Sequence, residues 1–128
     1  MIYLDSSVVL AQILMEDRQP SEAIWREKLV SSRLLEYEVW NRVHVRGLGT
    51  AGRIATETAL AQVDMYELSP DHLDRALFPF PISVRTLDSL HLATIDFLRR
   101  QGREIILASY DQRLLIAAAA LGIEAATL

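Results

Sequence analysis

The sequence predicts an α/β fold, a three-layer α/β/α sandwich around a central parallel sheet of four to five strands. Segments with strand character alternate with segments of helical periodicity along the whole chain. This alternation favours a parallel sheet whose right-handed crossovers place helices on both faces. The chain also opens on an apolar strand, residues 2–5, which delivers Asp5 at its carboxyl end, where a helix begins. Ligands of open parallel sheets bind at that edge, so we expect a functional site there.

The first half of the chain contains two expected strands and three expected helices. Ser6 or Ser7 is suited to cap the first helix, and the 16–20 segment, which ends in Pro20, terminates it. The long helix carries apolar residues at helical spacing and ends at Gly47. In chain order the predicted elements are a strand over 2–5, helices over 8–14 and 21–29, a strand over 29–32 and a helix over 34–47.

The second half repeats the alternation. Ser69 and Pro70 are a cap and a first helical position, and the helix that they start ends in the apolar loop 78–82. This loop and the apolar run 8–10 could contact a partner or belong to the core. The predicted elements are a helix over 51–63, a strand over 65–68, helices from 70 and over 87–100, a strand over 104–108, a helix over 111–121 and a possible fifth strand over 123–127.

Composition restricts the class of protein. The chain has 128 residues, of which 51% are hydrophobic, which suits a single domain over residues 1–128 with a substantial core. There are 17 acidic and 13 basic residues, a balance that argues against bulk electrostatic binding of nucleic acid. The sequence has no cysteine, which excludes disulfides and thiolate metal sites. With neither a secretory signal nor a membrane-spanning stretch, we expect a cytoplasmic protein with no membrane partner.

Four acidic residues lie on segments that can reach the same edge of the sheet: Asp5, Glu38, Asp88 and Asp111. Each has a simpler explanation. Asp5 and Asp111 follow strands and would serve as helix caps, and Asp88 falls in a first helical turn, where the macrodipole favours an acid. Glu38 could be an ordinary glutamate on the surface of its helix, but it borders the apolar stripe, whereas Glu36 points more outward.

Electrostatics indicates what such a group would hold. Two carboxylates about 4 Å apart repel each other by roughly 4 kcal/mol at an effective dielectric constant near 20, so several together need a cation or must take up protons. Oxygen ligands favour hard ions such as Mg²⁺ or Mn²⁺. His91, one turn after Asp88, is interpreted as a packed core histidine and not as a ligand, with donation to a carboxylate as the alternative.

Four segments carry a resemblance to a known family: 2–7, 32–39, 85–94 and 109–114, of which the string Leu87–Ala93 is the most specific. The sequence resembles the PIN-domain ribonucleases, specifically the VapC-type toxins of toxin–antitoxin pairs, nearly from end to end. This resemblance implies a PIN-like fold and a metal-dependent endoribonuclease that cleaves RNA, is inhibited by a cognate antitoxin and works as a homodimer.

The resemblance also implies roles for individual residues. Asp5 and Asp88 would bind Mg²⁺ or Mn²⁺ directly, and Glu38 and Asp111 would complete the site directly or through water. Ser6 and Ser109 would orient carboxylates or metal-bound waters. Asp96 is expected to be a solvated acid and not a further ligand. Arginines that could contact RNA phosphates, or could simply be solvated, are Arg42, Arg46, Arg85 and Arg113.

The sequence leaves two other functions open. A strand followed by an aspartate and a helix also suits a phosphatase-like α/β hydrolase with Asp5 as nucleophile. Such an enzyme requires a second aspartate two residues later, but Ser7 occupies that position. It also requires a lysine late in the chain, whereas Lys28 is the only lysine. A non-catalytic PIN scaffold is the other alternative, although such domains tend to lose acidic residues that are all present here.

Overall fold

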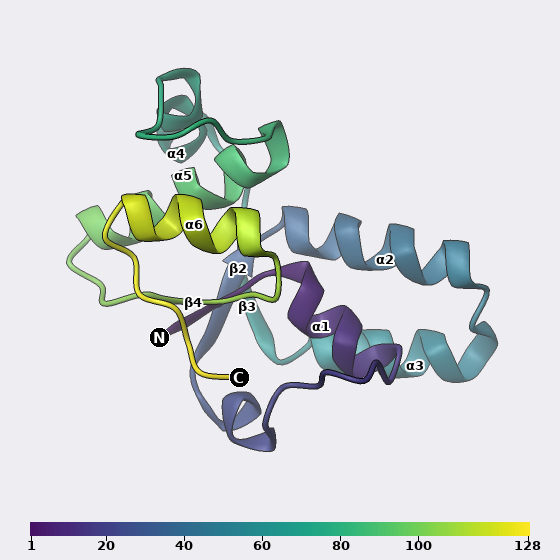
Figure 1. Ribbon diagram of the computed structural model, residues 1–128. Coiled ribbons are helices and arrows are strands. Elements are labelled where there is room, and N and C mark those ends of the chain that lie inside the picture. Colours follow the sequence, from purple (N-terminus) through teal and green to yellow (C-terminus); the bar gives the residue numbers. More distant parts are fainter.

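The computed structural model describes residues 1–128 as four parallel strands with helices on both faces of the sheet (Figure 1). The strands are β1 (Ile2–Leu4), β2 (Leu29–Ser32), β3 (Val63–Tyr66) and β4 (Ile106–Ala108). The α-helices are α1 (Ser6–Ile13), α2 (Leu34–Arg46), α3 (Gly49–Leu60), α4 (Pro70–Leu73), α5 (Thr86–Arg100) and α6 (Gln112–Ala120). Two 3₁₀ helices, η1 (Glu22–Arg26) and η2 (Asp74–Leu77), complete the chain. None of the helices combines the length and apolar character that crossing a membrane requires.

The strand order is β3-β2-β1-β4, and every pair is parallel. Ile2 on β1 lies between Leu29 on β2 and Ile106 on β4. From β1 the chain adds β2 and then β3 on one side, and it places β4 on the other side of β1. The boundary between β1 and β4 is therefore the topological switch point, where open parallel sheets form their binding crevices.

Alternate strand residues supply two separate cores, as the period of two in a buried strand requires. Ile2 and Leu4 pack with α1, α2 and α3 on one face, whereas Tyr3 packs with α5 and α6 on the other. The apolar run Val8–Leu10 belongs to the first core, so it is not an exposed partner surface. In the loop after η2, by contrast, Phe78 is exposed.

The turn between α2 and α3 depends on glycine. Gly47 ends α2 with φ of 61°, a left-handed conformation that costs glycine little because it has no Cβ. The chain then reverses, and Figure 1 shows α2 and α3 running back along each other at the right of the view. Because α2 begins two residues after β2 ends, its N-terminal half, which carries Glu38, lies at the carboxyl edge of the sheet.

Several predicted boundaries are wrong. The predicted helix 21–29 is only the short η1, because Leu29 belongs to β2. The third strand begins two residues earlier than predicted: Val63, whose spacing suggested a helix, pairs with Leu29 in the sheet. The possible fifth strand is reduced to one bridge between Leu107 and Ala125, so the sheet has four strands.

Candidate active site

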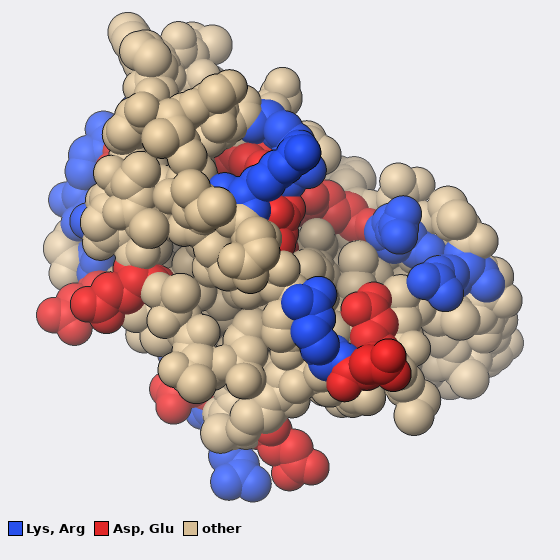
Figure 2. Space-filling model, in the orientation of Figure 1, with Lys and Arg blue, Asp and Glu red and all other residues tan.

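All four predicted acids line one pocket at the switch point of the sheet. The pocket has a volume of about 770 Å³ and lies where β1 and β4 end, between α1, α2, α5 and α6. Figure 2 shows acidic atoms in a hollow near the centre of the molecule, with basic atoms on both sides of it. The lining consists mostly of polar side chains: Asp5, Ser6, Ser7, Leu10, Glu38, Asn41, Arg42, Arg85, Thr86, Leu87, Asp88 and Asp111.

Asp5 is held by hydroxyl and amide donors at the end of β1. Its Oδ2 atom accepts hydrogen bonds from Ser7 Oγ at 2.5 Å, from Ser109 Oγ at 2.8 Å and from the Ser7 amide at 3.3 Å. Asp5 is itself the N-cap of α1, as its simpler explanation predicted, and neither Ser6 nor Ser7 is the cap. Because one carboxylate oxygen takes all these bonds, Asp5 can cap the helix and still present Oδ1 to a ligand.

Ser7 is the site residue that sequence reasoning missed. Its hydroxyl donates to Asp5 and accepts a hydrogen bond from the Tyr110 amide at 2.9 Å, which links α1 to the segment after β4. The signal was present, since an aspartate commonly accepts from the residue two positions later. Ser109 contacts Asp5 as predicted, whereas Ser6 lines the pocket without a hydrogen bond to a carboxylate.

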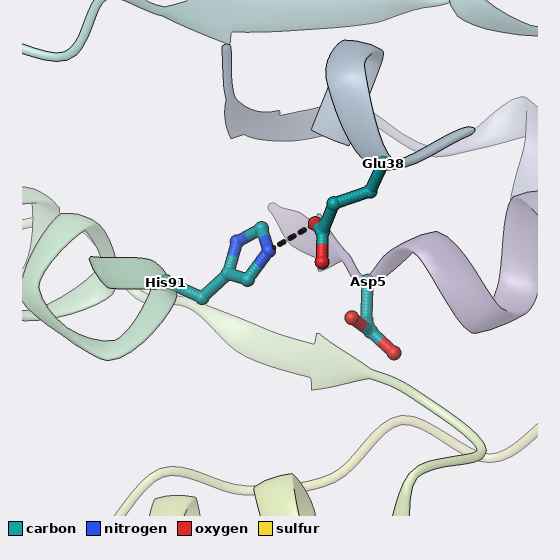
Figure 3. A group of neighbouring side chains, drawn as sticks. All are labelled: Asp5, Glu38 and His91. Atoms are coloured by element: carbon teal, nitrogen blue, oxygen red, sulfur yellow. Dashed lines mark hydrogen bonds and ion pairs between the residues drawn. The ribbon is translucent and has the colours of Figure 1, made fainter. Parts of the chain in front are cut away.

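Glu38, on α2, is paired with a buried histidine from α5 (Figure 3). His91 is 1% exposed, and its Nε2 atom lies 2.6 Å from Glu38 Oε1, while its Nδ1 atom lies 2.7 Å from the Tyr3 hydroxyl. Burial lowers the pKa of His91, but Tyr3 and Glu38 raise it by more, to about 10. His91 is thus the buried histidine that was predicted, and it also contacts a carboxylate, which was the alternative. Glu36 instead pairs with Arg33, away from this pocket.

Asp88 and Asp111 are bridged by a single arginine. Arg85 Nε lies 2.9 Å from Asp88 Oδ2, and its Nη2 lies 2.6 Å from Asp111 Oδ2. Partial burial raises the pKa of Asp111, but hydrogen bonds from Arg85 and from the Leu114 and Arg113 amides lower it below its ordinary value. Since those amides lie in the first turn of α6, Asp111 is both the N-cap of that helix and a lining residue of the pocket.

The four predicted arginines are not equivalent. Arg85 and Arg42 line the pocket itself. Arg113 is exposed in an adjoining hollow that also contains Arg85 and Asp88. Arg46 lies in the exposed last turn of α2, outside the pocket.

The chemistry of this donor set fits a hard divalent cation. Ligand atoms of Asp5, Glu38 and His91 all lie within 4.8 Å of one another. Glu38 has His91 as a partner, and Arg85 serves Asp88 and Asp111, but Asp5 has no cationic partner. Carboxylate oxygens with a net negative charge are the ligands that Mg²⁺ and Mn²⁺ prefer.

Comparisons with known proteins place the chain in a family. No protein-family model matches the sequence. Ribonuclease VapC46 of Mycobacterium tuberculosis is 35% identical over 128 residues, which cover 94% of this chain and 92% of that protein. Ribonuclease VapC35 of the same species is 31% identical over 131 residues, with coverages of 96% and 93%.

A solved structure supports the fold. The crystal structure of the Mycobacterium tuberculosis toxin VapC20, which cleaves the sarcin–ricin loop, matches with a TM-score of 0.63 and covers 100% of both chains. At 16% identity this likeness concerns the fold alone. The two curated relatives, which extend over nearly the whole sequence, carry the family assignment: the chain belongs to the VapC family of PIN-domain ribonucleases.

Proposed function

We propose that this protein is a Mg²⁺- or Mn²⁺-dependent endoribonuclease toxin that is neutralised by a cognate antitoxin. The observation that carries the proposal is the convergence of four carboxylates from α2, α5 and two helix caps on one pocket, in a chain of the VapC family. The residues are far apart in sequence, and capping alone would not require their side chains to share a pocket. RNA is the substrate class because the curated relatives are ribonucleases.

The metal would be held by Asp5 and Asp88 directly, with Glu38 and Asp111 completing the site directly or through water. When bound, the ion lowers the pKa of a bound water and neutralises charge on the attacked phosphate. Asp5 presents Oδ1, since Oδ2 is engaged by the Ser7 and Ser109 hydroxyls. Ser109 would orient the Asp5 carboxylate, and Ser6, which lines the pocket, would orient metal-bound waters. In-line attack by water leaves 5′-phosphate and 3′-hydroxyl ends.

The arginines around the pocket would attract the RNA backbone, which the carboxylates alone would repel. Arg85 and Arg42 are within the lining, and Arg113 and Arg46 extend the basic area outward. Arg85 also has a second task, because its guanidinium neutralises Asp88 and Asp111. A phosphate that draws Arg85 toward itself would free both carboxylates for the metal.

The family relationship also supports a proposal for the assembly and the cellular location of the toxin. We propose that residues 1–128 act as a single PIN-like domain, that the toxin is a homodimer and that it works in the cytoplasm, where its RNA substrate and its antitoxin are made. Exposed apolar side chains around the loop after η2 are available for contact with a second subunit or with the antitoxin: Leu77, Phe78, Ile82 and Leu87.

The proposal is tested by RNA cleavage with purified protein dialysed against EDTA. We expect no cleavage until Mg²⁺ or Mn²⁺ is added, and products with 5′-phosphate ends. Asp111→Asn should lower the rate while the protein remains folded. Cleavage that persists in excess EDTA would refute the metal dependence, and a folded wild-type protein that binds the ion but cleaves no RNA would indicate a non-catalytic scaffold.

A further inference from the structure

A chain of buried hydrogen bonds leads from the centre of the sheet to the pocket. The Ser32 amide, at the end of β2, donates to the Tyr3 hydroxyl at 3.1 Å. The same hydroxyl lies 2.7 Å from His91 Nδ1, and His91 Nε2 lies 2.6 Å from Glu38 Oε1. Tyr3 and Ser32 are completely buried, and His91 is nearly so. Such a polar chain is costly to bury unless every member is paired, and here every member is.

The direction of these bonds follows from the chemistry of their members. An ionised Glu38 carboxylate can only accept, so His91 Nε2 must carry a hydrogen and donate it. This holds whether the ring is neutral, with Tyr3 donating to Nδ1, or charged, with Nδ1 donating to Tyr3. A nitrogen that carries a hydrogen has no lone pair for a metal. His91 is therefore a hydrogen-bond donor to the carboxylate and not a ligand of the ion, although its ring lies among the candidate ligands.

We propose that Tyr3 and His91 are positioning residues that fix the carboxylate of Glu38 for metal binding, an inference that rests on the proposed function. Figure 3 shows the arrangement: one oxygen of Glu38 faces the His91 ring, and the other lies on the side of Asp5. With Oε1 held by His91, Glu38 presents Oε2 to the cleft, just as Asp5 presents Oδ1. The hydroxyl of Tyr3 in turn fixes the ring, which is also packed edge-on against the Tyr3 ring with centroids 5.7 Å apart.

This arrangement explains the use of a tyrosine in the middle of an otherwise aliphatic strand. Tyr3 has Ile2 and Leu4 as neighbours on β1, and packing alone would be satisfied by phenylalanine. Its hydroxyl is the one polar side-chain group of β1 in the core that α5 and α6 cover. Residues that hydrogen-bond to a metal ligand typically contribute 10–100-fold to metal affinity or activity.

Three variants separate the hydrogen bonds from the packing. Tyr3→Phe keeps the ring and removes the hydroxyl; His91→Gln keeps one donor, and His91→Phe removes both nitrogens. The matched control is Tyr66→Phe, which removes a sheet tyrosine hydroxyl bonded to Arg103, outside the pocket. Calorimetric titration with Mn²⁺ should show dissociation constants at least about tenfold weaker for His91→Phe. We expect a smaller loss for His91→Gln, a several-fold loss for Tyr3→Phe and no change for the control.

A measurement on the wild-type protein does not depend on any variant folding. In ¹⁵N NMR spectra of the imidazole groups, His91 Nε2 should carry its hydrogen before and after saturation with Mg²⁺. Loss of that hydrogen on Mg²⁺ binding would make His91 a ligand and overturn the inference. So would a Tyr3→Phe protein that is folded and binds Mn²⁺ as tightly as the wild type.

These outcomes separate the inference from the function on which it rests. A wild-type protein that binds Mn²⁺ and cleaves RNA, together with variants of unchanged metal affinity, overturns the positioning role alone. A wild-type protein that binds no Mn²⁺ refutes the metal site and the inference together. A protein that binds the ion but does not cleave RNA refutes only the ribonuclease assignment, because the titrations still measure the effect of Tyr3 and His91.

Discussion

Asp5→Asn should leave the metal-free protein nearly as stable as the wild type while abolishing its stabilisation by metal. Asp5 is the one member of the acidic group without a cationic partner, so its charge is a cost in the absence of metal. Ligand oxygens of Asp5 and Glu38 lie within 4.8 Å, a separation at which two charges repel by about 3.5 kcal/mol at an effective dielectric constant of 20. The pairing of Glu38 with His91 reduces this figure.

The opposing effect comes from the three hydrogen bonds that Asp5 Oδ2 accepts. An asparagine Oδ1 can accept the same bonds, but each changes from charge-assisted to neutral, a loss of about 1 kcal/mol per bond. The two effects nearly cancel, so the free energy of unfolding without metal should change by less than about 1 kcal/mol. For a chain of this size that corresponds to a shift in Tm of only about 4 °C.

Thermal unfolding with and without Mn²⁺ measures both quantities. At a metal concentration of 100 times Kd, the wild-type protein gains about 2.7 kcal/mol, because the ion binds only the folded state. Asp5→Asn should show no such gain, whereas Asp96→Asn should keep it, since Asp96 pairs with Arg100 outside the pocket. A folded Asp5→Asn protein with the full metal-dependent shift would refute the ligand role. A loss of more than about 3 kcal/mol without metal would refute the balance of repulsion and hydrogen bonding.

Three further predictions concern the neighbours of the carboxylates. Arg85→Ala should tighten Mn²⁺ binding in calorimetric titration, because the guanidinium competes for Asp88 and Asp111; weaker binding would show that Arg85 helps to organise the site. Ser109→Ala should weaken Mn²⁺ binding by about tenfold or more, since it removes a donor to Asp5, and unchanged affinity would contradict that role. The lowered pKa of Asp111 stabilises the fold at pH values above the ordinary pKa of an aspartate, and this contribution is lost as the pH falls through the lowered value. Acid unfolding of Asp111→Asn should therefore lack that part of the pH dependence, and a profile identical to that of the wild type would refute it.

The sequence was sufficient to predict that these four acids would share one edge of the sheet, because each stands at a feature visible locally. Asp5 and Asp111 follow apolar strands, Asp88 opens an apolar helix, and Glu38 borders an apolar stripe. The fold class could also be predicted from the sequence, because segments of strand character alternate with segments of helical periodicity. Local patterns do not specify where a short segment ends. For this reason the third strand was predicted two residues too late, and the predicted fifth strand is a single bridge in the structure.

Contacts between distant residues could not be predicted in the same way. Arg85 reaches Asp111 across 26 positions, Ser7 meets the Tyr110 amide across 103, and Tyr3 meets His91 across 88. Each joins elements that are distant in the chain, a neighbour relation that no single segment encodes. His91 is the clearest case, since the sequence offered contact with a carboxylate only as an alternative, and the structure identifies its two partners as Tyr3 and Glu38.

We expect the cleavage of RNA by the acidic pocket to require a divalent ion. Sequencing the 5′ ends of RNA treated with wild-type protein, Asp88→Asn and the control Asp96→Asn, each with and without Mg²⁺, tests it most directly. We predict new 5′-phosphate ends with the wild type and the control, only in the presence of Mg²⁺, and none with Asp88→Asn. Cleavage by Asp88→Asn at the wild-type rate, or equal cleavage without Mg²⁺, would refute this role of the pocket and of the ion.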